Sequence, residues 1–373
     1  MREGPGDSEK TGITRRRFLE RGAAAGVGLY GAGGGLTILS TRMRAKPLAP
    51  DGDLQFFNWA QYMNPAILKG FEKEYKVKVQ QTYFANMQGM LSKLRAGVKY
   101  DVTFPEADYA DQLVKADYLL ELDHAKIPNI KNVAQPFQNP WYDANAKHSV
   151  PYAIWTTGIF WNKKVLGPMT GSWSDLWNNT AKTKGKLWLL DDMKEVIGMS
   201  LLRDGKPISS TSSSDVKTAA ANVLKLKGAV RGYTTVSNQV TSGQSVMSHL
   251  WSGTSYQALL GLKGDAANWQ YETAKEGIPV GSDTIVIPKN APHPNTAMLF
   301  INWMLAPENS ASNPPYIGYP MMTNAGISAY SKLVTKYPWL KITIPEVAKG
   351  QHFQPLSGSA LSLYSSQWAK IKA

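Results

Sequence analysis

Strand-like and helix-like segments alternate from residue 53 onward, and this alternation constrains the fold more than any other feature of the sequence. Apolar, β-branched and aromatic residues favour strands at 54–59, 77–83 and 100–104, whereas apolar residues at helical spacing favour helices at 65–75 and 87–95. Strands that alternate with helices build a mostly parallel sheet covered by helices. The sequence therefore predicts an α/β fold.

A long apolar and aromatic segment at 149–162 follows this first α/β region and shows no helical period. It predicts a strand that crosses into a second α/β region. The other expected elements are helices at 108–116, 192–202, 215–227, 256–262 and 298–305, strands at 186–190, 245–251 and 284–288, and a surface loop at 306–315. Two α/β units joined by extended crossings predict a hinged clamp, with a ligand site between its lobes near the carboxyl ends of strands.

The same pattern predicts the limits of the lobes. Residues 1–50 are expected to be an export signal or anchor segment. Lobe 1 is expected to comprise residues 51–155 and 283–340. Lobe 2 is expected to comprise residues 156–282, with the C-terminal segment 341–373 completing it.

The N-terminal segment has the pattern of an address for export. Residues 14–19 contain three consecutive arginines followed by Phe-Leu, and a Gly- and Ala-rich apolar stretch covers residues 22–39. A basic region before a weakly hydrophobic segment is typical of an export signal, and paired arginines before Phe-Leu resemble the twin-arginine type. We expect an exported protein that is periplasmic or associated with the cell surface. An uncleaved membrane anchor is the alternative.

Composition narrows the classes of function. The chain has no cysteine, which excludes disulfides, thiolate catalysis and zinc–thiolate sites, and its five histidines lack the spacing of a metal site. Residues 1–46, with nine basic and four acidic side chains, account for part of the formal net charge of +13. The other lysines are scattered, and no nucleic-acid-binding motif is present. We therefore expect a monomer with no cofactor, no metal and no nucleic-acid partner.

Eight short motifs occur in a fixed order over about residues 52–370. They are Asn58–Tyr62, Tyr100–Pro105, Val150–Gly158, Ser172–Trp177, Asp191–Val196, Leu250–Gly253, Asp283–Pro288 and Ile317–Pro320. In order and spacing these motifs resemble the polyamine (spermidine/putrescine) binding proteins of bacterial ABC importers. The resemblance implies a type II periplasmic-binding-protein fold, a small cationic amine in the interlobe cleft, and a membrane permease as partner.

An alkylammonium ligand needs carboxylates for its charge and aromatic faces for its methylene groups. The resemblance implies that Asp283 binds one amine and that Trp251 forms an aromatic wall. The further ligand-binding residues that it implies are Asp192, Glu195, Trp59, Gln61, Tyr62, Tyr319 and Gln354. The pair Asp192 and Glu195 has a second interpretation, because Asp-x-x-Glu before an apolar run is also the signature of a helix-capping box.

The chain departs from the family pattern at three places. Gln61 stands where the family has an acid, and Gly281 stands where it has an aromatic residue. The loop after the third strand contains Glu106 and Asp108, which are candidates to restore the missing charge. Another amine-bearing solute, such as an amino-acid derivative, 4-aminobutyrate or a quaternary amine, is therefore an alternative to a polyamine.

An enzyme is the competing class of function. A secreted hydrolase would use Asp192 and Glu195 as a general acid and base. Residues one helical turn apart lie on the same side of a substrate, whereas glycoside hydrolysis needs carboxylates that flank the bond. No nucleophile elbow is present, and no adjacent tyrosines suggest an iron-binding relative. We expect a binding protein without catalytic activity.

Overall fold

The computed structural model describes residues 48–342 and 350–373, so the predicted export segment at residues 1–50 lies almost entirely outside the described residues. Among the described residues, no helix has the length and apolar character needed to cross a membrane.

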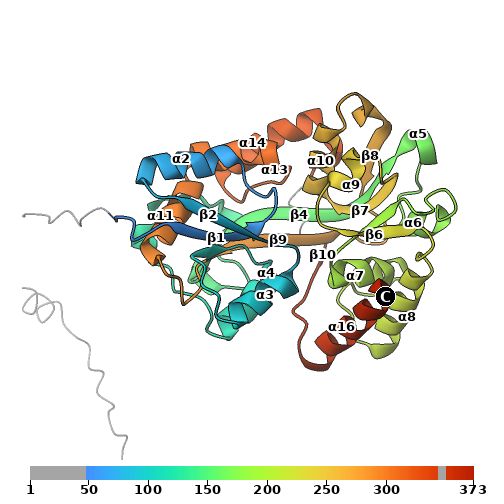
Figure 1. The fold of residues 1–373 in the computed structure, drawn as a ribbon, viewed down its shortest axis with the longest axis horizontal. Helices are drawn as coiled ribbons and strands as arrows, with labels where there is room; N and C mark the ends of the chain where they lie inside the picture. Colours follow the sequence, from blue (N-terminus) through green and yellow to red (C-terminus); the bar gives the residue numbers. More distant parts are fainter. Residues whose placement is uncertain (1–47, 343–349) are drawn as a thin grey trace, which may run out of the picture. The chain divides into compact units, whose positions relative to one another are not determined.

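A mixed β-sheet runs through the centre of this part of the chain (Figure 1). Its strands follow the order β2-β1-β3-β9-β4-β7-β5-β6, with β10 beside β9 and β8 beside β4. The strands are β1 (Leu54–Trp59), β2 (Val79–Phe84), β3 (Val102–Thr103), β4 (Ser149–Asn162), β5 (Leu187–Leu190), β6 (Val230–Thr234), β7 (Met247–Trp251), β8 (Trp269–Glu272), β9 (Pro279–Val286) and β10 (Gln351–His352).

The predicted β-α-β-α-β region is confirmed. Strand β1 pairs in parallel with both β2 and β3. Helix α2 (Pro65–Tyr75) begins where the side chain of Asn64 accepts a hydrogen bond from the backbone N–H of Ala66, and proline occupies its first turn. Helix α3 (Met87–Arg95) has the predicted bounds and is capped by Asn86.

Strand β4 is the longest strand of the described residues and has the predicted bounds, 149–162. Its first half pairs with β9, and its second half pairs with β7 and β8, in each case antiparallel. All of its residues except Asn162 are buried. The continuous apolar sequence follows from this position, because a central strand that is covered on both faces cannot alternate polar and apolar residues.

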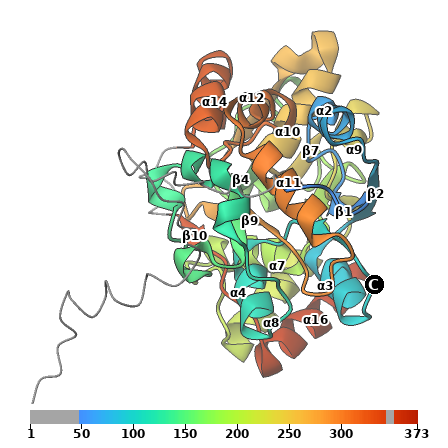
Figure 2. The ribbon, with the colours of Figure 1, turned by 90° about the vertical axis from the view of Figure 1, so that its left-hand side faces the viewer.

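Helices cover both faces of the sheet, as Figures 1 and 2 show from two directions. One face carries α2 together with α10 (Ser252–Gly261), α11 (Pro294–Met304) and α14 (Asn324–Lys336). The other face carries α3 together with α4 (Ala107–Lys115), α7 (Met193–Arg203), α8 (Ser213–Leu224) and α16 (Gly358–Lys372). The C-terminal helix α16 packs on α7 and α8, and Tyr364 donates a hydrogen bond to the backbone oxygen of Ser210 at 2.9 Å.

The predictions for the loop at 306–315 and for the starts of α10, α11 and β9 are wrong. The expected loop at 306–315 contains the short helices α12 (Pro307–Ser312) and α13 (Pro314–Ile317). Each begins at a proline, whose fixed φ suits the first turn of a helix. Helix α10 begins at Ser252 and not at residue 256, because it follows β7 without a connecting loop. Helix α11 begins at Pro294 and not at residue 298, and strand β9 begins at Pro279 and not at residue 284.

The topology brings several strand ends to one region. Parallel strands β1 and β3 end at Trp59 and Thr103, and parallel strands β5 and β7 end at Leu190 and Trp251. Strand β9 crosses between these two groups of strands and carries Asp283. Ligands of open α/β sheets bind beyond the carboxyl ends of strands.

Candidate functional site

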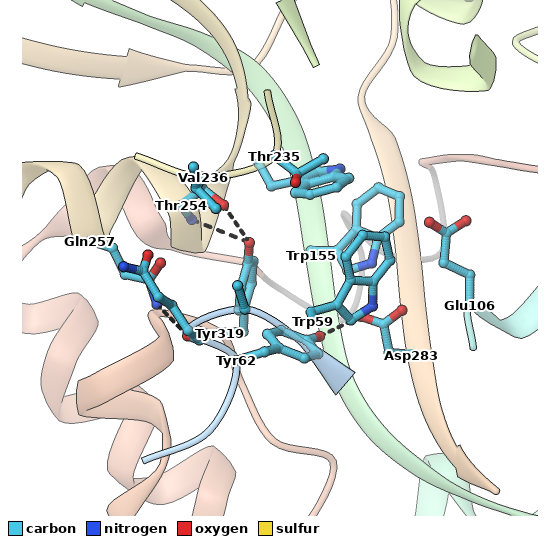
Figure 3. Close-up of a pocket in the computed structure, with 13 residues that line it drawn as sticks. Trp59, Tyr62, Glu106, Trp155, Thr235, Val236, Thr254, Gln257, Asp283 and Tyr319 are labelled. Atoms are coloured by element: carbon cyan, nitrogen blue, oxygen red, sulfur yellow. Dashed lines mark hydrogen bonds between the residues drawn. The ribbon is translucent and has the colours of Figure 1, made fainter. Parts of the chain in front are cut away.

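A pocket opens where these strand ends meet, and its empty space, including the part open to solvent, measures about 520 Å³. Its walls include the aromatic side chains Trp59, Tyr62, Trp155, Trp251 and Tyr319, the acids Glu106 and Asp283, and the neutral polar side chains Gln61, Thr235, Thr254 and Gln257. Figure 3 shows the acids and two tryptophans at one end of the pocket, with the neutral polar side chains of Thr254 and Gln257 at the other. The pocket therefore has an acidic end and a neutral polar end.

Three indole rings lie together along the pocket. The rings of Trp59 and Trp251 meet edge to face at 5.7 Å between centroids. The rings of Trp155 and Trp251 are 5.9 Å apart and inclined by 52°. Aromatic faces of this kind cover methylene groups and attract a cation.

The indole ring of Trp155 lies next to Gly281, the position where the resemblance implied an aromatic residue. The two residues face each other across the pairing of β4 with β9. A Cβ atom at position 281 would lie 2.0 Å from Cζ2 of Trp155, so only glycine leaves room for the indole ring. Sequence analysis missed Trp155, because the register that places it opposite Gly281 is not visible in the sequence.

Asp283 lies at the acidic end of the pocket and is buried. Its Oδ2 atom accepts a hydrogen bond from the hydroxyl group of Tyr62, whereas Oδ1 has no hydrogen-bond partner. Burial raises the pKa of Asp283 to about 7, although the hydrogen bond from Tyr62 and the nearby indole N–H of Trp155 lower it. A buried carboxylate oxygen without a partner is costly, and an ammonium group in the pocket would satisfy it.

Glu195 is buried behind Trp251 and does not line the pocket. Its Oε1 atom accepts hydrogen bonds from Nε1 of Trp251 at 2.7 Å and from the hydroxyl group of Thr157 at 2.8 Å. Burial and the nearby charge of Asp192 together raise the pKa of Glu195 to about 8, although the hydrogen bonds from Trp251 and Thr157 lower it. In this arrangement Glu195 orients the indole ring of Trp251.

Asp192 caps helix α7, as one of the two interpretations of the sequence predicts. Its Oδ1 atom accepts hydrogen bonds from the backbone N–H groups of Lys194 and Glu195, at 2.8 and 3.1 Å. Its other carboxylate oxygen is buried without a partner. Because the side chain of Glu195 is bonded to Trp251 and Thr157, the pair does not form the reciprocal capping box.

Two acids at the start of α4, the N-cap residue Glu106 and Asp108 in the first turn, contact a lysine from the protein itself, so only Glu106 lies in the loop that the sequence predicted. Nζ of Lys194 lies 3.1 Å from Oε2 of Glu106 and 2.8 Å from Oδ2 of Asp108. It also lies 4.2 Å from the centre of the Tyr109 ring and 5.2 Å from that of Phe353. All three charged side chains are buried. Burial lowers the pKa of Lys194, but the surrounding acids raise it by more, so that it lies well above its usual value.

The remaining predicted residues fall into two groups. Gln61 and Tyr319 line the pocket; the backbone oxygen of Gln61 accepts a hydrogen bond from Gln257, and the Tyr319 hydroxyl group accepts one from the backbone of Thr254. Gln354 has an exposed side chain, and its backbone N–H binds Ser209 outside the pocket. Lys194 was also missed in the sequence. Its position between Asp192 and Glu195 gives no sign that its side chain pairs with Glu106 and Asp108.

No group of three or more histidine, cysteine, aspartate or glutamate side chains with the arrangement of a metal site occurs within residues 48–342 and 350–373.

Comparison with known proteins shows the relationship of the chain. The family model of the bacterial extracellular solute-binding proteins matches residues 66–341. The spermidine/putrescine-binding periplasmic protein of Salmonella typhimurium is 28% identical over 340 residues, which cover 90% of this chain and 96% of the relative. The putrescine/cadaverine-binding protein of Pseudomonas aeruginosa is 28% identical over 294 residues, which cover 76% of this chain and 83% of the relative.

Solved structures agree with this relationship. A Listeria monocytogenes protein assigned to a spermidine/putrescine ABC transporter superposes with a TM-score of 0.79 at 25% identity, covering 86% of this chain and 99% of the other. A lipoprotein of Treponema pallidum superposes with a TM-score of 0.73 at 24% identity, covering 86% of this chain and 99% of the other. The predicted α/β fold of the periplasmic binding proteins, with two lobes, is confirmed.

Proposed function

The chain belongs to the bacterial extracellular solute-binding proteins, and on that basis we propose that it binds a small amine-bearing solute and delivers it to an ABC importer. Its relatives include spermidine/putrescine-binding periplasmic proteins, and the similar Listeria monocytogenes structure is assigned to a spermidine/putrescine ABC transporter. The pocket described above is the proposed binding site, and we assign it to the cleft between the two lobes.

The buried carboxylate of Asp283 is the observation that carries this proposal. It lies in the pocket wall with one oxygen bonded to Tyr62 and the other without a partner. An ammonium group of the solute would bind the free oxygen by a charge-assisted hydrogen bond. The rings of Trp59, Trp155 and Trp251 would cover the methylene groups next to it.

The proposed site does not favour catalysis. Asp192 is engaged in capping α7, and Glu195 is bonded to Trp251 behind the pocket wall. Neither carboxylate flanks a position that a scissile bond could take. The hydrolase alternative thus lacks its general acid and base, and binding is the proposed activity.

The proposed setting is outside the cytoplasmic membrane. Several relatives are named as periplasmic proteins. We propose that the N-terminal segment with Arg15, Arg16 and Arg17 directs export by the twin-arginine route and that the protein works as a monomer with a membrane permease. No nucleic-acid partner is proposed.

A solute other than a polyamine is the second candidate. Gln61 is neutral where the family has an acid, and the aromatic ring at the pocket comes from Trp155 in place of position 281. These changes suit amine-bearing solutes such as amino-acid derivatives, 4-aminobutyrate or quaternary amines.

A thermal-shift panel tests the proposal. The purified protein would be heated with putrescine, spermidine, 4-aminobutyrate, choline and N-acetylputrescine, each at millimolar concentration. A ligand that binds only the folded protein raises the melting temperature, and a concentration of 100 times Kd adds about 2.7 kcal/mol to its stability. We expect at least one amine of the panel to raise the melting temperature. A panel in which no amine does so would contradict the proposed function.

A further inference from the structure

The buried side chain of Lys194 contacts a set of groups that would also suit an amine of a ligand. Its ammonium group contacts Glu106 and Asp108 together and lies over the ring of Tyr109. Two carboxylates and an aromatic face are the partners that an alkylammonium ligand seeks. The lysine side chain, a tethered alkylammonium, thus fills this set of partners from inside the protein.

The pocket wall has little negative charge that is not already paired within the protein. Glu106 and Asp283 are the ionisable acids among the side chains that line the pocket, and no lysine or arginine lines it. Oε2 of Glu106 is paired with Lys194, and Asp283 is the acid of the pocket wall with a fully buried carboxylate oxygen that has no hydrogen-bond partner. A second ammonium group in the pocket would find no unpaired carboxylate, and a desolvated charge without a partner is costly.

The rest of the pocket offers partners for an uncharged polar group. Gln61, Thr254 and Gln257 provide neutral amide and hydroxyl groups. The indole N–H of Trp59, which lies in the pocket wall at the acidic end, is also buried without an acceptor. An ammonium group has no lone pair to accept this hydrogen bond, whereas a hydroxyl or carbonyl oxygen does.

We propose that the ligand is a monoamine, with one ammonium group for Asp283 and an uncharged oxygen-bearing end, such as an amino alcohol or an acylated diamine. This inference rests on the proposed function and narrows its substrate class. The second ammonium group of a diamine adds no binding free energy, because the two acids that would bind it, Glu106 and Asp108, are already paired with Lys194.

Calorimetric titration with three matched ligands tests the inference. Putrescine, 4-aminobutan-1-ol and N-acetylputrescine share a four-carbon chain with one ammonium group, and they differ in the other end. We expect putrescine to bind no tighter than the two monoamines. Putrescine that binds about tenfold tighter than both, a difference of about 1.4 kcal/mol, would overturn the inference.

The variant Lys194→Met tests the cause. Removing the tethered ammonium group frees Glu106 and Asp108, so the affinity for putrescine should rise about tenfold relative to that for 4-aminobutan-1-ol. The matched control combines Lys194→Met with Glu106→Gln and Asp108→Asn, which removes the freed charges and should abolish the gain. An unchanged ratio in folded Lys194→Met would refute the role of Lys194.

The outcomes separate this inference from the function on which it rests. If Lys194→Met does not fold, the monoamine inference is tested by the order of affinities of the three ligands for the unmodified protein. If all three bind and putrescine is preferred, the monoamine inference is wrong and amine binding stands. If no amine binds, the proposed function itself is wrong.

Discussion

Asp283 is the residue on which the chemistry of the pocket depends most. Its carboxyl group is buried, one oxygen is bonded to Tyr62, and the other is free. Burial raises the pKa of Asp283 to about 7. At neutral pH the side chain of Asp283 is therefore protonated in part of the ligand-free molecules and ionised in the others. A cationic ligand binds the carboxylate and therefore shifts this equilibrium.

Ligand affinity should depend on pH with a definite sign. Below pH 7 the ligand must displace a proton from Asp283, so affinity should rise about tenfold per pH unit up to about pH 7. Above pH 7 it should level off, because an alkylammonium group stays charged to about pH 10. Titration calorimetry from pH 5 to pH 9 measures the profile.

The variant Asp283→Asn is the control for this profile. It cannot titrate at position 283, so the steep rise below pH 7 should disappear. Glu106 and Glu195, whose pKa values burial also raises, would leave only a weaker dependence. An equally steep profile in the variant would show that another group controls binding.

Residue types in the site were predictable from the sequence, but their partners were not. Asp283, Trp251, Trp59 and Tyr62 were expected at the pocket, and the structure places all four in its wall. Glu106 was also expected to bind the ligand, yet its charge is taken by a lysine 88 positions away in the sequence. Such long-range pairing depends on how loops meet after folding, and no local pattern records it.

At the scale of elements, the pairing of β4 with β9 decides which aromatic ring enters the pocket. Trp155 and Gly281 are opposite each other in this pairing, and the indole ring lies over the glycine. The aromatic ring at this part of the pocket wall therefore comes from Trp155 of β4 and not from position 281 of β9. The two positions are coupled, because a side chain at 281 and the ring of Trp155 compete for one space.

Replacing Gly281 by alanine should disturb the pocket wall. The new methyl group would lie 2.0 Å from Trp155, so the ring must move, and overpacking of this kind costs about 1–3 kcal/mol of the free energy of unfolding. Urea denaturation measures the loss. The control Gly228→Ala has open space around its Cβ position and should change stability little. Equal stability of the two variants would contradict the close approach of Trp155.

Elements with a strong local signal were predicted better than those without one. Strand β1 and helix α3 have the predicted bounds, because the first is rich in apolar and aromatic residues and the second lies between Asn86 and Gly97. Helices α12 and α13 were mistaken for a loop, since their prolines and polar residues resemble turn sequences. Strand β10, which has two residues, exists only through its pairing with β9.

At the scale of the whole molecule, β4 and β9 are the proposed hinge. Strand β4 pairs with β9 in its first half and with β7 and β8 in its second half, so it is shared by the two groups of strands. The proposed pocket contains residues from both groups, including Trp59 of β1 and Trp251 of β7. A ligand that contacts both groups favours a closed arrangement over an open one.

Ligand binding should therefore make the protein more compact. Small-angle X-ray scattering is expected to give a smaller radius of gyration with a saturating amine than without it. The variant Asp283→Asn under the same conditions is the control and should change less, because it binds the amine weakly. An unchanged radius of gyration with a tightly bound ligand would be evidence against closure about β4 and β9.

The central claim is that Asp283 binds the ammonium group of the solute, and calorimetric titration of wild type, Asp283→Asn and Asp117→Asn tests it most directly. Asp117 is a matched surface control, since its side chain is 79% exposed. The account predicts one binding site in wild type, a loss of about 2–5 kcal/mol of binding free energy in Asp283→Asn, and no change in Asp117→Asn. Equal affinity of wild type and Asp283→Asn for the amine would contradict it.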